Sequence, residues 1–126
     1  MDEALAHLRV ALDYSARESI LLAAQAAPRG EPLTVAAFER LLAEAEGGAA
    51  PAPPVDLLIR SGGEQRLSDF LLWESAYAEL MFTPAMWPDF TADHLEAAVR
   101  EFHSRERRFG GLANTVEPAS RLGYGR

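Results

Sequence analysis

One stretch of the sequence, residues 56–79 (DLLIRSGGEQRLSDFLLWESAYAE), constrains the fold and the function more than any other. An apolar run over residues 55–59, broken only by Asp56, has the length and the β-branched content of a buried strand. The run ends at residues 60–64, RSGGE, where two glycines permit the positive φ angles of a tight turn. In such a turn, successive backbone N–H groups can face an anion. The stretch therefore predicts a strand that leads into an anion-binding turn.

Polar side chains of three kinds surround this glycine turn. Two arginines, Arg60 and Arg66, flank it, and each guanidinium can present two parallel donors to phosphate oxygens. A serine hydroxyl follows, and two glutamates supply the carboxylate oxygens with which Mg²⁺ is held against a phosphate. The pattern predicts a diphosphate site with Mg²⁺ as its cation. The candidate residues are Arg60, Gly62, Gly63, Glu64, Arg66, Ser68 and Glu79.

The same residues are also consistent with a purely structural role. An apolar run followed by SGGE is an ordinary way for a strand to end. Arg60 and Arg66 would then pair with Glu64 or Asp69 on the surface, where ion pairs contribute little to stability. Spacing alone leaves both interpretations open.

The stretch DLLIRSGGEQRLSDFLLWESAYAEL resembles the signature of the cis-prenyltransferases, the undecaprenyl diphosphate synthase family. The similarity continues through FTPAMWPDF (residues 82–90) and SRERRFGG (residues 104–111). This resemblance implies an α/β fold of parallel strands with flanking helices, of which the chain holds the C-terminal half. The family's N-terminal loop, Asp-Gly-Asn-Gly-Arg, which carries its catalytic aspartate, is not in this sequence. We expect one truncated domain over residues 1–111 and a disordered tail over residues 112–126.

The resemblance also implies a reaction, the condensation of isopentenyl diphosphate with an allylic diphosphate in the cis configuration. The isopentenyl diphosphate would bind the glycine turn and its arginines, with Mg²⁺ on Glu79. Arg108 and Gly110 would act on the diphosphate site of a neighbouring subunit in a dimer. The allylic diphosphate would bind a part of the enzyme supplied by another chain, in a split or heteromeric enzyme. The alternative is a non-catalytic diphosphate-binding or regulatory subunit, or a truncated relic.

Composition narrows the partners and the location. A net charge of −7 argues against a nucleic-acid binder, whose surface would be basic. Cysteine is absent, so disulfides and thiolate metal sites are excluded. The acidic start of the chain and the lack of a long apolar run predict neither a signal peptide nor a transmembrane segment. We expect a cytoplasmic protein that contacts a membrane only peripherally, through its lipid product.

Hydrophobic spacing and capping residues predict the remaining elements. Residues 7–14 are expected to form a strand, with Leu8, Val10 and Leu12 on one face. Helices are expected over residues 16–27 and after Thr34, Ser68 and Thr91. The further expectations concern single residues. Trp73 and Tyr77 are expected to pack in the core, and His94 and His103 to lie on the surface. The arginines of residues 105–108 have an alternative role, the stabilisation of a helix C-terminus.

Overall fold

The structure is a computed structural model that describes residues 6–105. The predicted roles of Arg108 and Gly110, and the predicted disorder of residues 112–126, lie outside these described residues. In chain order the elements are α1 (Ala16–Ala26), α2 (Val35–Ala45), β1 (Leu57–Arg60), β2 (Glu79–Phe82), the 3₁₀ helix η1 (Trp87–Asp89) and α3 (Ala92–Ser104). Across the described residues, no helix has both the length and the apolar character that a membrane span requires.

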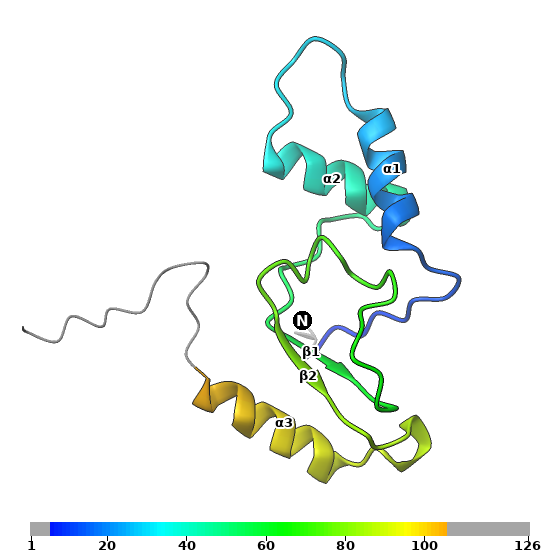
Figure 1. Ribbon diagram of the computed structural model, residues 1–126. Helices are drawn as coiled ribbons and strands as arrows, with labels where there is room; N and C mark the ends of the chain where they lie inside the picture. Colours follow the sequence, from blue (N-terminus) through cyan, green and yellow to red (C-terminus); the bar gives the residue numbers. More distant parts are fainter. Residues whose placement is uncertain (1–5, 106–126) are drawn as a thin grey trace, which may run out of the picture.

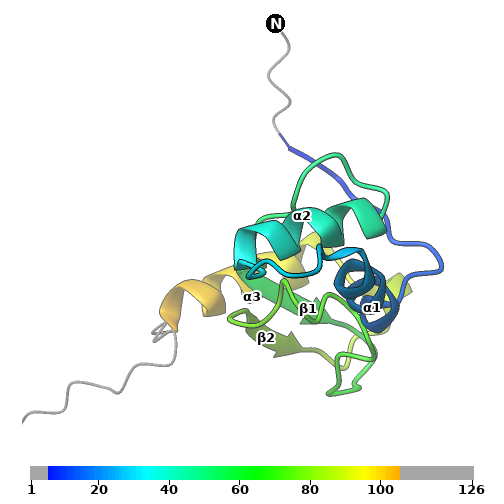
Figure 2. The same ribbon diagram turned by 90° about the horizontal axis from the view of Figure 1, so that it is seen from above.

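The two strands form a parallel sheet at the centre of the described chain. Figures 1 and 2 show the pair α1 and α2 on one side of this sheet and α3 on the other. The predicted α/β class, with parallel strands and flanking helices, is confirmed.

The three helices begin at the residues that the sequence indicates. The hydroxyl oxygens of Ser15 and Thr34 each accept a backbone N–H three residues on, at 3.1 Å. At α3, the backbone N–H of Thr91 donates to Nδ1 of His94 at 3.0 Å. These bonds satisfy donors that the first turn of a helix leaves without a partner. His94 is exposed, as expected, and its ring helps to cap α3.

A small hydrophobic core lies between α1 and α2. Ala23, Phe38 and Leu42 are buried together, and Ala23 has no exposed surface. The ring of Trp73 packs on Phe38, with the ring centroids 4.6 Å apart. Core packing is therefore right for one face of Trp73, but it is wrong for Tyr77, which is 65% exposed.

The strand predicted for residues 7–14 does not form. Residues 6–11 are irregular, and Leu8, Val10 and Leu12 are 89%, 71% and 83% exposed. A strand needs a neighbour that accepts and donates along its backbone, and the sheet of the described residues consists of β1 and β2 alone. The apolar alternation is present, but no described element covers it.

The helix predicted after Ser68 is also wrong. Ser68, Asp69 and Leu71 have φ angles of 48°, 63° and 46°, in the left-handed region that a right-handed helix excludes. Residues 68–77 form bends and turns instead. Isolated backbone bonds hold these turns, such as the one from the N–H of Ser75 to the carbonyl of Leu71 at 2.9 Å.

These turns bury one carboxylate oxygen of Glu74 without a hydrogen-bond partner. Oε2 of Glu74 is inaccessible to solvent and has no hydrogen bond, beside a cavity of about 490 Å³ that Tyr14 and Glu46 also line. Burial, with a smaller contribution from the charge of Glu46, raises the pKa of Glu74 above its ordinary value of 4.5. The folded state therefore favours the neutral acid, and ionising Glu74 costs stability.

We expect Glu74→Gln to stabilise the protein at pH 7.5, where the carboxylate is ionised in the unfolded chain. Glutamine keeps a polar atom at this place and removes only the charge, so the gain equals the free energy that ionising Glu74 costs the folded protein. As the pH falls through 4.5 the acid becomes protonated in the unfolded chain as well, so the difference should shrink. Thermal unfolding at pH 7.5 and pH 4 measures both values. Equal melting midpoints at pH 7.5 would show that ionised Glu74 is well solvated in the native protein.

Candidate functional site

The carboxyl end of β1 leads into a turn that folds back on the chain after β2. Gly62 and Gly63 have φ angles of +90° and +78°, which side chains rarely allow. Their N–H groups donate to the carbonyls of Ala85 and Thr83 at 2.8 and 2.9 Å. The prediction that these N–H groups face a phosphate is therefore not met in this structure. The two glycines fix the shape of the turn instead.

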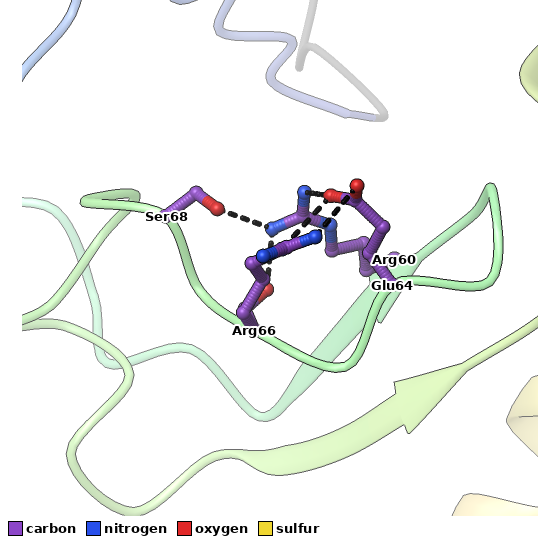
Figure 3. Close-up of polar contacts among 4 residues, drawn as sticks. All are labelled: Arg60, Glu64, Arg66 and Ser68. Carbon is purple, nitrogen blue, oxygen red and sulfur yellow. Dashed lines mark hydrogen bonds and ion pairs between the residues drawn. The ribbon is translucent and has the colours of Figure 1, made fainter.

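Arg60, the last residue of β1, holds the turn from inside (Figure 3). One terminal nitrogen donates to the backbone carbonyl of Arg66 at 2.5 Å and to the hydroxyl of Ser68 at 2.8 Å. The other donates to Oε2 of Glu64 at 2.5 Å. The Arg60 side chain is 25% exposed. Its donors thus join the two ends of residues 60–68, which we call the arginine turn.

Arg66 lies at the open side of the arginine turn. Its Nε and Nη2 bind the two carboxylate oxygens of Glu64 at 3.0 and 2.8 Å, so the guanidinium fork holds one oxyanion group. The hydrogen bond and charge of Arg66 lower the pKa of Glu64, and the same contact raises the pKa of Arg66. The Arg66 side chain remains 64% exposed. A hollow of about 280 Å³ adjoins it, and Arg60, Ser68 and Phe70 also line that hollow.

These contacts bear on both interpretations of the arginines, the structural role and the diphosphate site. Both arginines pair with Glu64, as the structural interpretation predicts. The pairing also shows that the Arg66 fork is oriented to bind an oxyanion at the rim of a hollow. Phosphate oxygens have the same bidentate geometry as a carboxylate. The geometry is therefore compatible with both roles.

Asp69, the other acid considered as a partner, has a different role. Its carboxylate accepts the hydroxyl of Ser15 at 2.6 Å and the N–H of Arg17 at 2.9 Å, at the first turn of α1. The bond from Ser15 is the main cause that lowers the pKa of Asp69. Asp69 thereby connects the arginine turn to α1. Sequence reasoning missed this connection, because no local pattern relates residues 15 and 69.

Glu79 lies apart from the arginine turn. The register pairs Leu57 with Glu79 and Arg60 with Phe82, so Arg60 and Glu79 sit at opposite ends of the sheet, about 10 Å apart along the strands. Because side chains alternate along a strand, these two also point to opposite faces. Oε2 of Glu79 binds a terminal nitrogen of Arg105 at 3.1 Å.

This geometry does not give a complete Mg²⁺ site. Among residues 6–105, no three His, Cys, Asp or Glu side chains lie together in a way that could hold a metal ion. Mg²⁺ commonly takes one or two carboxylates together with substrate phosphates. Glu79 supplies one carboxylate, but its charge is already paired and it does not face the arginine turn. The described residues therefore do not fit a cation bridging Glu79 to a diphosphate held there.

Comparisons with known proteins identify the family to which the chain belongs. The sequence model of a family described as "Putative undecaprenyl diphosphate synthase" matches residues 2–110. The chain belongs to that family. It is 58% identical over 106 residues to "Isoprenyl transferase 1" of Bradyrhizobium diazoefficiens, covering 84% of this chain and 42% of that protein. It is 45% identical over 104 residues to an isoprenyl transferase of Wolinella succinogenes, covering 82% and 43%.

Solved structures of the undecaprenyl diphosphate synthase family share its fold. Lavandulyl diphosphate synthase from Lavandula x intermedia, in complex with dimethylallyl diphosphate, matches with a TM-score of 0.67 and 36% identity, over 77% of this chain and 43% of that one. A probable undecaprenyl diphosphate synthase from Campylobacter jejuni matches with a TM-score of 0.60 and 36% identity, over 77% and 44%. The chain thus spans less than half the length of the relatives and structures that it matches, and it has a partial cis-prenyltransferase fold.

Proposed function

We propose that the arginine turn binds the diphosphate group of isopentenyl diphosphate, and that the chain contributes this site to a cis-prenyltransferase. The observation that carries the proposal is the Arg66 fork, which holds the carboxylate of Glu64 through two parallel donors at the rim of a hollow. Membership of the undecaprenyl diphosphate synthase family supports a prenyl diphosphate as the ligand.

The residues of the arginine turn would divide the work. The guanidinium of Arg66 would exchange the carboxylate of Glu64 for a phosphate, because both accept the same bidentate pair of hydrogen bonds and the phosphate carries more charge. Arg60 and Ser68 would keep the turn in shape, and Gly62 and Gly63 would hold it against residues 83–85. Glu64, at 48% exposed, would stay beside the two arginines and keep them parallel before the ligand binds.

Mg²⁺ is proposed as the cation that accompanies the diphosphate, where it would neutralise charge on the phosphate oxygens. The metal-binding role that the sequence predicts for Glu79 is not part of this proposal, because its carboxylate pairs with Arg105. The cytoplasmic location, and the contribution of Arg108 and Gly110 across a dimer, stay predictions from the sequence.

The second substrate would bind outside this chain. The relatives extend over more than twice the length matched here. We propose that a partner polypeptide supplies the site for the allylic diphosphate, in a hetero- or homo-oligomer. The related lavandulyl diphosphate synthase structure, which contains dimethylallyl diphosphate, supports that substrate class. The second candidate function is diphosphate binding without catalysis, for which the Arg66 fork at the rim of the hollow would serve equally well.

Thermal unfolding with added ligands tests the proposed binding site. We expect isopentenyl diphosphate with Mg²⁺ to raise the melting midpoint in a saturable way, because a ligand that binds only the native state stabilises it. Inorganic diphosphate should produce a similar rise, and inorganic phosphate a much smaller one. If isopentenyl diphosphate at millimolar concentration leaves the midpoint unchanged, the arginine turn is not a diphosphate site in this chain.

A further inference from the structure

Helix α3 has little apolar contact with the rest of the described chain. Ala98 is its one buried residue, and Leu95 and Val99 remain 48% and 39% exposed. Figure 1 shows α3 beyond β2, away from α1 and α2. A helix of this kind gains little from burial. Polar contacts at its ends therefore carry an unusual share of its attachment.

The strongest of these contacts lies at the C-terminal end of α3. Arg105, the C-cap residue, donates from Nη1 to Oε2 of Glu79 and to the carbonyl of Leu80, both at 3.1 Å. Its Nη2 donates to Oε1 of Glu101, one turn back on α3. The side chains of Arg105 and Glu79 are 34% and 24% exposed, so water screens the pair less than at an open surface. One guanidinium thus joins α3 to the first two residues of β2.

We propose that Glu79 acts as the ion-pair partner of Arg105, and that the two are positioning residues that fix the C-terminal end of α3 on β2. In this role Glu79 needs no metal, because the guanidinium neutralises its charge and fills the position of a cation. The inference rests on the proposed function only in linking the pair to diphosphate binding. The two are linked through the chain, because the RRFGG motif (residues 107–111), which contains Arg108 and Gly110, begins two residues after Arg105.

Electrostatics separates this role from that of a metal ligand. A free divalent cation at Glu79 would meet a positive guanidinium 3.1 Å from the same carboxylate oxygen. A cation at Oε2 would have to displace the guanidinium from that oxygen, and a cation at the other carboxylate oxygen would lie beside its positive charge. The arginine turn, at the other end and on the other face of the sheet, offers no phosphate to compensate.

Hydrogen exchange on Glu79→Gln, Arg105→Gln and the double variant tests the pair. Each single change should speed exchange of the α3 amides by about two- to fivefold, the range for a partly exposed ion pair, and leave α1 and α2 unchanged. The double variant should match Arg105→Gln, because that change already removes the contact with Glu79 as well as those with Leu80 and Glu101. Arg105→Lys should recover part of the protection, since it keeps the charge and loses the fork. Effects of the single changes that simply add would overturn the proposal.

The metal readout uses Mn²⁺, whose free form gives an electron paramagnetic resonance signal. Wild-type protein without diphosphate should leave the Mn²⁺ signal unchanged. With isopentenyl diphosphate present, the Glu79→Gln and Arg105→Gln variants should bind Mn²⁺ as well as the wild-type protein does. If Glu79→Gln alone abolishes Mn²⁺ binding, Glu79 is a metal ligand and the inference is wrong. If wild type binds no isopentenyl diphosphate, the proposed function fails, while hydrogen exchange still decides the role of Glu79. If Arg105→Gln does not fold, Glu101→Gln can replace it. This change removes one hydrogen bond of Arg105 and should speed exchange of the α3 amides by a smaller factor.

Discussion

Arg66→Ala is expected to weaken the binding of isopentenyl diphosphate by about 10- to 100-fold, the loss of about one charge-assisted hydrogen bond, because Arg66 gives up its two bonds to Glu64 when it binds the phosphate. The unliganded protein should keep its melting midpoint, because the Arg66 side chain is 64% exposed and pairs with Glu64 on the surface. The ligand-induced rise in midpoint measures the affinity. Arg66→Lys should recover part of it, since a lysine keeps the charge without the planar fork.

Arg60→Ala is expected to differ from Arg66→Ala in a specific way. Arg60 joins the carbonyl of residue 66, the hydroxyl of Ser68 and the carboxylate of Glu64, so its loss should lower the midpoint of the unliganded protein as well as the affinity. Arg100→Ala is the matched control for Arg66→Ala, because Arg100 forms a comparable exposed pair with Glu96 on α3. A diphosphate response that survives Arg66→Ala unchanged would remove the arginine turn as the binding site.

The features that the sequence predicted correctly depend on short-range chemistry. Ser15, Thr34 and Thr91 each bond within three residues, so capping patterns located the starts of α1, α2 and α3. The turn after β1 was likewise recognisable, because positive φ angles at Gly62 and Gly63 need glycine. The grouping of the arginines with Glu64 followed from the same short span.

The failures arose where a residue's state depends on distant parts of the chain. The alternation at Leu8, Val10 and Leu12 specifies an exposed and a covered face, but a strand also needs a neighbour. After Ser68, the apolar spacing favours a helix, but the left-handed backbone at three positions prevents a right-handed helix from forming. Glu79 was expected to hold Mg²⁺ against the diphosphate bound by the arginines. The parallel register, which the sequence does not reveal, places it at the other end of the sheet.

The purified chain is expected to associate with another polypeptide and, alone, to catalyse no prenyl transfer. Parallel sheets are normally covered on both faces and continue over more than two strands, whereas the described sheet ends at β1 and β2. Residues 6–11 are irregular, with the side chains of Leu8 and Val10 exposed, and exposed apolar segments associate readily with another chain. A dimer or larger species is therefore expected by light scattering.

The partner that best suits this surface is a polypeptide with the part of the family fold that this chain does not span. Adding the N-terminal half of a relative should convert residues 7–12 into a paired strand and restore condensation of isopentenyl diphosphate with an allylic diphosphate. Replacing Leu8, Val10 and Leu12 by serine should prevent both association and activity. The same change at Leu21, Leu22 and Leu33, which are also exposed but lie on or after α1, should prevent neither. A monodisperse monomer that elongates an allylic diphosphate unaided would contradict the need for a partner, because all the catalytic groups would then have to lie within this one chain.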